Sequence, residues 1–237
     1  MILKGILTSA FLAATLGTAL AADAKEEVVQ AAKALKEKGN YSWKVTVAVP
    51  ANSQFNPGPT EGKADKDILY ITSTFRDNKS EAYVQGSKAV FTNQDGEWQT
   101  LAEAENAEGA GRFMAARYRN VKAPAAQAEE LAGQVKELKK DGDAYSGELT
   151  EAAAKQYMSL GGRRGGGGDG PQINSAKGTA KFWVKEGLLS KFEFHVKGSM
   201  KNRDGEDREV DRTTTVEIKE VGTTTVTVPE SVKKKLG

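Results

Sequence analysis

Residues 174–229 read NSAKGTAKFWVKEGLLSKFEFHVKGSMKNRDGEDREVDRTTTVEIKEVGTTTVTVP, and three runs within them alternate apolar and polar side chains. The even positions are the apolar ones, as Phe182, Phe192 and Val216 illustrate, whereas the odd positions carry lysine, threonine and glutamate. Because successive side chains of a strand point to opposite faces, the alternation predicts three strands with one dry and one wet face. An antiparallel sheet accommodates this pattern.

Two short glycine-containing segments separate these runs. Glu186-Gly187 stands between the first and second, and residues 202–205 (Asn-Arg-Asp-Gly) stand between the second and third. Short connections with glycine are typical of hairpin turns. The three strands are therefore expected to pair in sequence order, as a meander.

The preceding part of the chain predicts further strands and one leading helix. Val28, Ala31, Ala32 and Leu35 form one apolar stripe, which indicates a helix over residues 23–38 that ends at a glycine. Strands are expected at 40–49, 68–75, 81–84, 88–92 and 97–101. Residues 51–66, rich in proline and glycine, are interpreted as a polar loop and a candidate flap.

Residues 102–160 differ in composition and predict a helical insert. They are rich in alanine, glutamate and lysine, and the apolar stripe that ends in Val135 and Leu138 predicts a helix from Pro124 to Lys140. Thr150 is a candidate N-cap of a further helix, and residues 144–149 are a possible strand. The run Gly161–Gly170 is expected to be a flexible loop without the Lys-Ser/Thr pair of a phosphate-binding loop.

The N-terminus has the pattern of a secretory signal peptide. Lys4 precedes an apolar segment over 6–20, and Ala19-Leu20-Ala21 supplies small residues at a cleavage site. We expect residues 1–21 to be removed after Ala21, which leaves residues 22–237 as a single periplasmic domain without a membrane span. The absence of cysteine excludes a lipid-anchored bacterial lipoprotein and zinc sites built on thiolates.

The sequence lacks catalytic and metal-binding motifs. The only histidine, His195, lies on the polar face, and acidic residues are scattered, so neither an enzyme nor a cofactor is expected. The net charge of +2 gives no reason to expect a nucleic-acid partner. Arg212 shares the dry face with Val210 and Val216. We interpret it as a side chain that reaches solvent at the sheet edge; the alternative is an anion-binding group.

The order of elements resembles the periplasmic lipoprotein-carrier superfamily, which includes LolA, LolB, LppX, LprG and RseB. The resemblance rests on the signal peptide, the leading helix, the inserted helices and the final meander ending in Val-x-Val-Pro-Glu, together with residues 83–90 (YVQGSKAV) and 95–98 (DGEW). It implies an α+β fold in which a large, curved antiparallel sheet, an incomplete barrel, wraps around helices and holds acyl chains in an apolar cavity.

Two functional hypotheses follow from the dry face. The first is a soluble periplasmic carrier or chaperone that sequesters the acyl chains of a lipid or lipidated protein on the concave face. The alternative is an envelope protein-interaction or stress-sensing module, with a filled core and no ligand. The candidate ligand-binding residues are Phe182, Val184, Phe192, Phe194, Val196, Met200, Arg212, Val216 and Ile218.

Overall fold

A single antiparallel sheet organises the molecule. The computed structural model describes residues 13–51, 53, 57–75, 78–106, 110–159, 172–201 and 205–237. Within them the eleven strands are β1 (Asn40–Ala48), β2 (Thr60–Asp65), β3 (Ile68–Phe75), β4 (Asn78–Gln85), β5 (Lys88–Thr92), β6 (Trp98–Thr100), β7 (Lys139–Asp141), β8 (Ala144–Glu148), β9 (Ile173–Lys185), β10 (Leu188–Lys201) and β11 (Asp207–Lys219). Their order is β6-β5-β4-β3-β2-β1-β11-β10-β9-β8-β7. The predicted α+β class with one large antiparallel sheet is confirmed.

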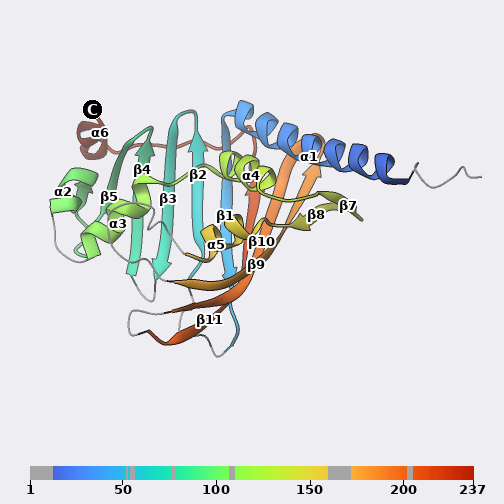
Figure 1. Ribbon diagram of the computed structural model, residues 1–237. Helices are drawn as coiled ribbons and strands as arrows, with labels where there is room; N and C mark the ends of the chain where they lie inside the picture. Colours follow the sequence, from blue (N-terminus) through green and yellow to red (C-terminus); the bar gives the residue numbers. More distant parts are fainter. Residues whose placement is uncertain are drawn as a thin grey trace, which may run out of the picture.

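The strand order consists of two meanders that meet at the centre of the sheet. The first runs from β1 outward to β6, the second runs from β7 inward to β11, and β1 pairs with β11. Three helices, α2 (Leu101–Asn106), α3 (Ala110–Arg119) and α4 (Pro124–Gly133), carry the chain from one edge of the sheet to the other. They cross one side of the sheet, as Figure 1 shows. The sheet is thus an open half-barrel bridged by helices.

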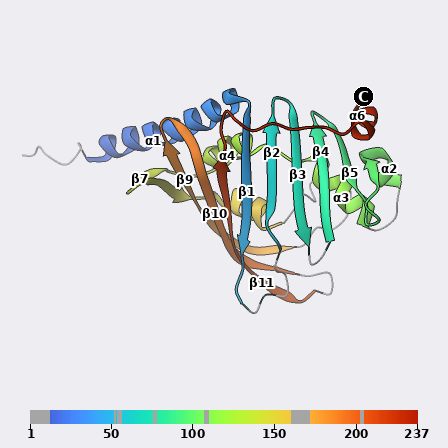
Figure 2. The ribbon, with the colours of Figure 1, turned by 180° about the vertical axis from the view of Figure 1, so that it is seen from behind.

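Helices cover both faces of the sheet, but unequally. The long α1 (Ala13–Lys38) packs on α4 and β10, and α5 (Glu151–Met158) packs on β9 and β10. The last helix, α6 (Glu230–Leu236), packs on β5 and β6. The chain before α6 crosses the strands on the opposite side, which is the near side in Figure 2. We call the face beneath α1 to α5 the concave face.

Buried side chains form three clusters. The largest contains Leu35, Leu131, Phe182 and Phe192, and joins α1, α4 and α5 to the centre of the sheet. The second contains Phe91 and Tyr118 beneath α2 and α3. The third lies on the opposite face, where Val232 and Leu236 of α6 pack against Tyr83 and Val90. The concave face therefore carries a large core at the centre of the sheet and a smaller one near β5, and Leu69 contacts both.

The strands predicted from residues 174–229 are confirmed as β9, β10 and β11, although residues 221–229 form no strand. Glu186 and Gly187 both have positive φ, 51° and 74°, as a tight two-residue hairpin turn requires. The even-numbered dry face is buried: Phe182, Phe192 and Val196 are completely inaccessible to solvent. The period-two pattern therefore identified the correct face.

Three other predictions about the elements need correction. Residues 60–65 are strand β2 and not part of a loop. The helix predicted from 124 to 140 ends at Gly133, because the chain turns back so that Val135 bridges Leu149 and residues 139–141 form β7. The leading helix is longer than residues 23–38 and starts at Ala13. It runs through Ala21, and cleavage there stays a prediction.

None of the described helices has the length and hydropathy needed to cross a membrane. The predicted glycine-rich loop, Gly161–Gly170, lies outside the described residues.

Candidate functional site

The strand register arranges concave-face side chains in rows across the sheet. One row is Ser80, Ser73, Thr60, Val45, Val216, Phe192, Phe182 and Tyr145, from β4 through the centre to β8. Its side chains are small on β2 to β4 and aromatic on β8 to β10. Within this row, the β2 to β4 part therefore carries less side-chain bulk than the β8 to β10 part.

Small residues occupy the concave side of β2 throughout its length. Thr60, Gly62 and Ala64 alternate with exposed Glu61 and Lys63, so β2 itself contributes no bulky side chain to the concave face. The indole ring of Trp43, on the neighbouring strand β1, lies over Gly62. Aromatic clusters flank this strip, with Phe91 beneath α3 on one side and Phe192 on the other. Gly62 and Ala64 are buried, and Thr60 is the partly exposed member of this strip of small residues.

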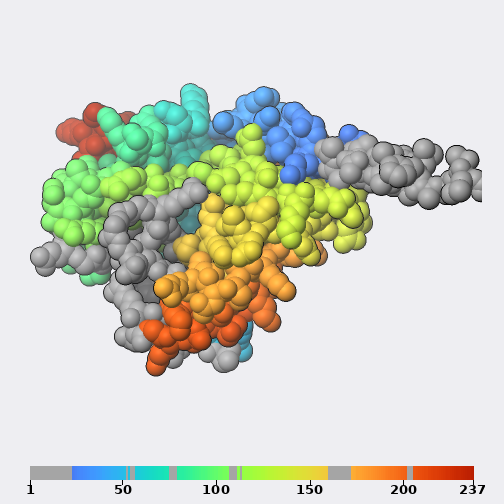
Figure 3. Space-filling model, viewed as in Figure 1, coloured from blue at the N-terminus to red at the C-terminus, as the bar shows by residue number. Residues whose placement is uncertain are grey.

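Several apolar side chains along this strip are only partly buried. Val45 and Leu69 pack against the large core, and Leu69 also touches the second core beneath α2 and α3. Ser73 and Ser80 face each other, with their hydroxyl oxygens 2.8 Å apart. In Figure 3, teal atoms of the sheet are visible in a hollow beside the yellow-green surface of α4 and α5. We define the trough by Val45, Val47, Thr60, Leu69 and Ser73.

The predicted ligand-binding residues divide into two groups. Six are buried, namely Phe182, Phe192, Phe194, Val196, Arg212 and Val216, whereas Val184, Met200 and Ile218 are partly exposed. All of them except Arg212 belong to the large core cluster or pack against it. The structure therefore brings these eight apolar side chains together, and helices α1, α4 and α5 cover much of their surface.

Arg212 differs from its predicted position. We interpreted it as an edge residue that reaches solvent, and this is wrong: only 4% of Arg212 is exposed. Strand β11 is central, between β1 and β10, and α5 covers its concave side at this point. Nη2 of Arg212 donates to the carbonyl oxygen of Tyr157, in the last turn of α5. Burial lowers the pKa of the guanidinium from 12.5 to about 10, so the group stays charged at neutral pH.

His195 lies on the polar face, as predicted. Its Nε2 atom is 2.8 Å from Oδ1 of Asp211, and the hydrogen bond from His195 holds the pKa of that carboxyl below its ordinary value. A cleft of about 500 Å³ next to it is lined by Lys136, Glu148, Leu149, Glu151, Ala176, Lys177, Gly178, Thr179, His195 and Lys197. Among the described residues no group of acidic or histidine side chains could hold a metal ion.

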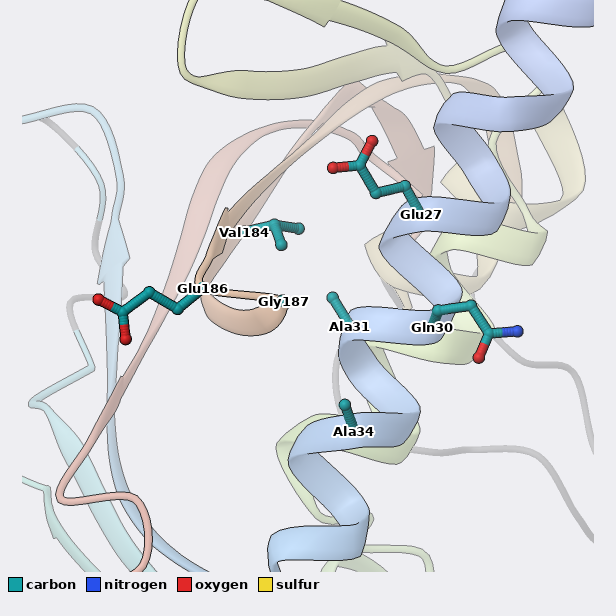
Figure 4. Close-up of a pocket in the computed structure, with 7 residues that line it drawn as sticks. All are labelled: Glu27, Gln30, Ala31, Ala34, Val184, Glu186 and Gly187. Carbon is teal, nitrogen blue, oxygen red and sulfur yellow. The ribbon is translucent and has the colours of Figure 1, made fainter.

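A second cleft, of about 420 Å³, lies between α1 and the β9–β10 turn. Ala31 and Val184 point toward each other across it, and Glu186 points away from α1 (Figure 4). Glu27, beside this cleft, hydrogen-bonds to Tyr145, and burial is the main cause that raises the pKa of Tyr145 to about 12. The cleft thus combines a small apolar floor with acidic side chains at its rim.

Sequence reasoning missed the trough residues of β1 to β3. Val45 and Val47 lie in the strand predicted at 40–49 but were not predicted to belong to a site, and Thr60 lies in the predicted loop 51–66. The small residues at alternate positions of 60–64 were the available signal. That signal could not be used without the register that sets Thr60 beside Val45.

Comparison with known proteins concerns architecture alone. No family model and no curated protein matches the sequence. Among solved structures, the chain is similar to the lipoprotein LppX of Mycobacterium tuberculosis, with 12% identity and a TM-score of 0.49, over 86% of this chain and 98% of that one. It is also similar to LprF of Mycobacterium bovis, with 14% identity and a TM-score of 0.44, over 89% and 98%.

Proposed function

We propose that this protein is an exported carrier or chaperone that binds the acyl chains of a lipid or lipidated protein in the trough of the concave face. The observation that carries the proposal is the row from Ser80 to Tyr145, in which small side chains on β2 to β4 adjoin an aromatic wall. An acyl chain placed there would lie along Val45 and Leu69. Each Å² of apolar surface removed from water contributes about 25 cal/mol.

The predicted ligand-binding residues differ in how close they lie to the trough and in how far they are exposed. Phe192, Phe194 and Val216 lie nearest to β1 in the register and are buried in the same core as Phe182 and Val196. In this proposal, Phe192, Phe194 and Val216 would contact the acyl chain once it enters the trough. Val184, Met200 and Ile218 are the partly exposed members of the predicted set. Sequestration needs no catalytic group, and the carrier would act in the periplasm after removal of residues 1–21.

The alternative function, an envelope protein-interaction or stress-sensing module with a filled core, is favoured by one observation. Phe182, Phe192 and Val196 are completely buried by the protein itself, and Val216 is 1% exposed. If the trough were closed in the same way, the fold would serve as a scaffold for surface contacts. The two proposals therefore differ in whether the strip over β2 and β3 takes up a ligand.

Two measurements distinguish these functions. Native mass spectrometry of the protein purified from a bacterial envelope is expected to show a bound species with the mass of a lipid. After delipidation, the protein is expected to take up a fluorescent fatty acid with saturable binding. Protein that carries no lipid and takes up no fatty acid would refute the carrier function and support the filled-core alternative.

A further inference from the structure

Arg212 is a buried cation that the protein itself only partly accommodates. A guanidinium offers five N–H donors and accepts none. The structure gives one of its hydrogen bonds, from Nη2 to the carbonyl oxygen of Tyr157. The Nε atom is buried and has no hydrogen-bond partner among the described residues. Burial of an unsatisfied donor on a charged group is costly, so a partner at this position would stabilise the protein.

Among the described residues, no carboxylate forms an ion pair with Arg212. The ion pairs between described residues join acidic groups to other cations. The Asp211 carboxylate, next in sequence, points to the other face, where it contacts His195 and Lys197. Buried arginines are normally paired with an anion. Arg212 is thus a buried positive charge without a negative partner in the described protein.

A purely structural role accounts for only part of this arrangement. The contact with Tyr157 places a positive charge at the C-terminal end of α5, where the helix dipole favours cations. That contact uses one edge of the guanidinium. It does not explain why Nε remains without an acceptor, since a lysine or a glutamine could also donate to a single carbonyl.

The register places Arg212 at the end of the trough. On β11 the concave positions run Val216, Thr214, Arg212, and they pair with β1 so that Val216 lies opposite Val45 and Thr214 opposite Val47. Arg212 follows by one further step along the same face. A ligand whose chain lies along β1 would therefore have its end group near the guanidinium.

We propose that Arg212 binds the oxyanion head group of the acyl ligand, so that the ligand class is an anionic lipid with a carboxylate or phosphate. This inference rests on the proposed carrier function and adds its selectivity. Carboxylate and phosphate both match the fork of a guanidinium and accept two parallel hydrogen bonds. A neutral lipid would fill the trough but leave Nε without an acceptor.

The test compares ligands that differ only in the head group. Palmitic acid and hexadecanol compete with a fluorescent fatty acid for delipidated protein at pH 7.5, and acetate and inorganic phosphate are tested as free anions. Because a hydrogen bond to a charged group is worth about 1.5–3 kcal/mol, the wild-type protein should prefer the acid by about 10- to 100-fold. Neither free anion should compete at millimolar concentration.

Variants assign this preference to Arg212. Arg212→Gln should bind hexadecanol as the wild type does and lose the preference for the acid, and Arg212→Lys should retain part of it. Arg208→Gln is the matched control, since Arg208 lies four residues earlier on β11 and is exposed. It removes the same charge from the same strand, and the preference should persist. Far-ultraviolet circular dichroism verifies that each variant is folded.

Several results would overturn the inference. Equal affinity of wild-type protein for the acid and the alcohol would do so without reference to any variant. So would a preference that survives Arg212→Gln, or competition by acetate or phosphate alone, which would indicate a site for free anions. Failure of the proposed function has a different signature, because neither palmitic acid nor hexadecanol would then displace the probe.

Discussion

The indole ring of Trp43 lies directly over Gly62, its cross-strand partner on β2. A Cβ atom built on Gly62 would be 2.1 Å from Cζ2 of Trp43, far inside contact distance. Glycine inside a strand often marks such a close approach, because any side chain would occupy the same space. The pair therefore places a bulky ring on the concave face of β2, where it covers Gly62.

Replacement of Gly62 by alanine should destabilise the protein. The added methyl group must displace Trp43, whose surroundings are a packed core, and overpacking of this kind costs about 1–3 kcal/mol. Urea unfolding followed by tryptophan fluorescence measures the loss. Gly133→Ala is the control, since a Cβ at Gly133 meets nothing within 4 Å. An unchanged midpoint for Gly62→Ala would show that Trp43 can move at no cost.

Loss of the N-cap of α5 should also reduce stability. The side chain of Thr150 accepts a hydrogen bond from the backbone N–H of Ala153, at 3.2 Å. Thr150→Ala leaves that donor without its partner and should cost about 1 kcal/mol, whereas Thr150→Ser keeps the hydroxyl and should be close to neutral. Thermal unfolding of the two variants compares them directly. Equal melting temperatures would contradict the capping role.

The attachment of α6 should depend on pH through Glu103. Hydrogen bonds from Lys235 and from the backbone N–H of Thr100 lower the pKa of Glu103 to about 2. A depressed pKa means that the charged form favours the folded state. This stabilisation is therefore complete above the ordinary glutamate pKa of about 4.5 and is lost as the pH falls toward 2.

Glu103→Gln removes this titration. Its melting temperature should lie below that of the wild type at pH 6, and the difference should shrink as the pH falls from about 4.5 to 2. Lys235→Gln removes the partner on α6 and should weaken the same dependence, since the Lys235 ammonium lies 2.8 Å from the carboxylate. A wild-type curve parallel to that of Glu103→Gln would show that the pair contributes nothing.

The C-terminal half of the sheet was predictable because its pattern depends on local alternation. Apolar residues recur at every second position of these strands. The hairpin turn between β9 and β10 pairs Phe182 with Phe192, so both lie on the same face. Helix α5 was predictable for a related reason, since Thr150 precedes it as a cap. In these segments local preference and tertiary packing agree.

The trough and Arg212 were not predictable, because they depend on contacts between distant segments. The sequence of β2 has little strand preference of its own, since Gly62 lies between Glu61 and Lys63. The strand forms because β1 and β3 pair with it on both sides. Arg212 is buried because β1, near the other end of the chain, pairs with β11 and because α5 covers the concave side there. The residues next to β2 and next to Arg212 in the sequence do not indicate these strand pairings.

The trough can be blocked at a single position to test the carrier function. Thr60 is partly exposed and lies on the concave face between Val45 and Ser73, whereas its neighbour Glu61 is exposed on the other face. Thr60→Trp would fill the trough with an indole and should lower fatty-acid affinity by at least about tenfold, which corresponds to about 1.4 kcal/mol.

Glu61→Trp is the matched control for this substitution, because it adds the same side chain one residue away on the wet face. It should bind the fluorescent fatty acid as the wild type does. Both variants should retain the wild-type circular dichroism spectrum, since neither position is fully buried. Equal binding by the two variants would place any acyl chain elsewhere, and the cleft between α1 and the β9–β10 turn would then be the next position to block, by Ala34→Trp.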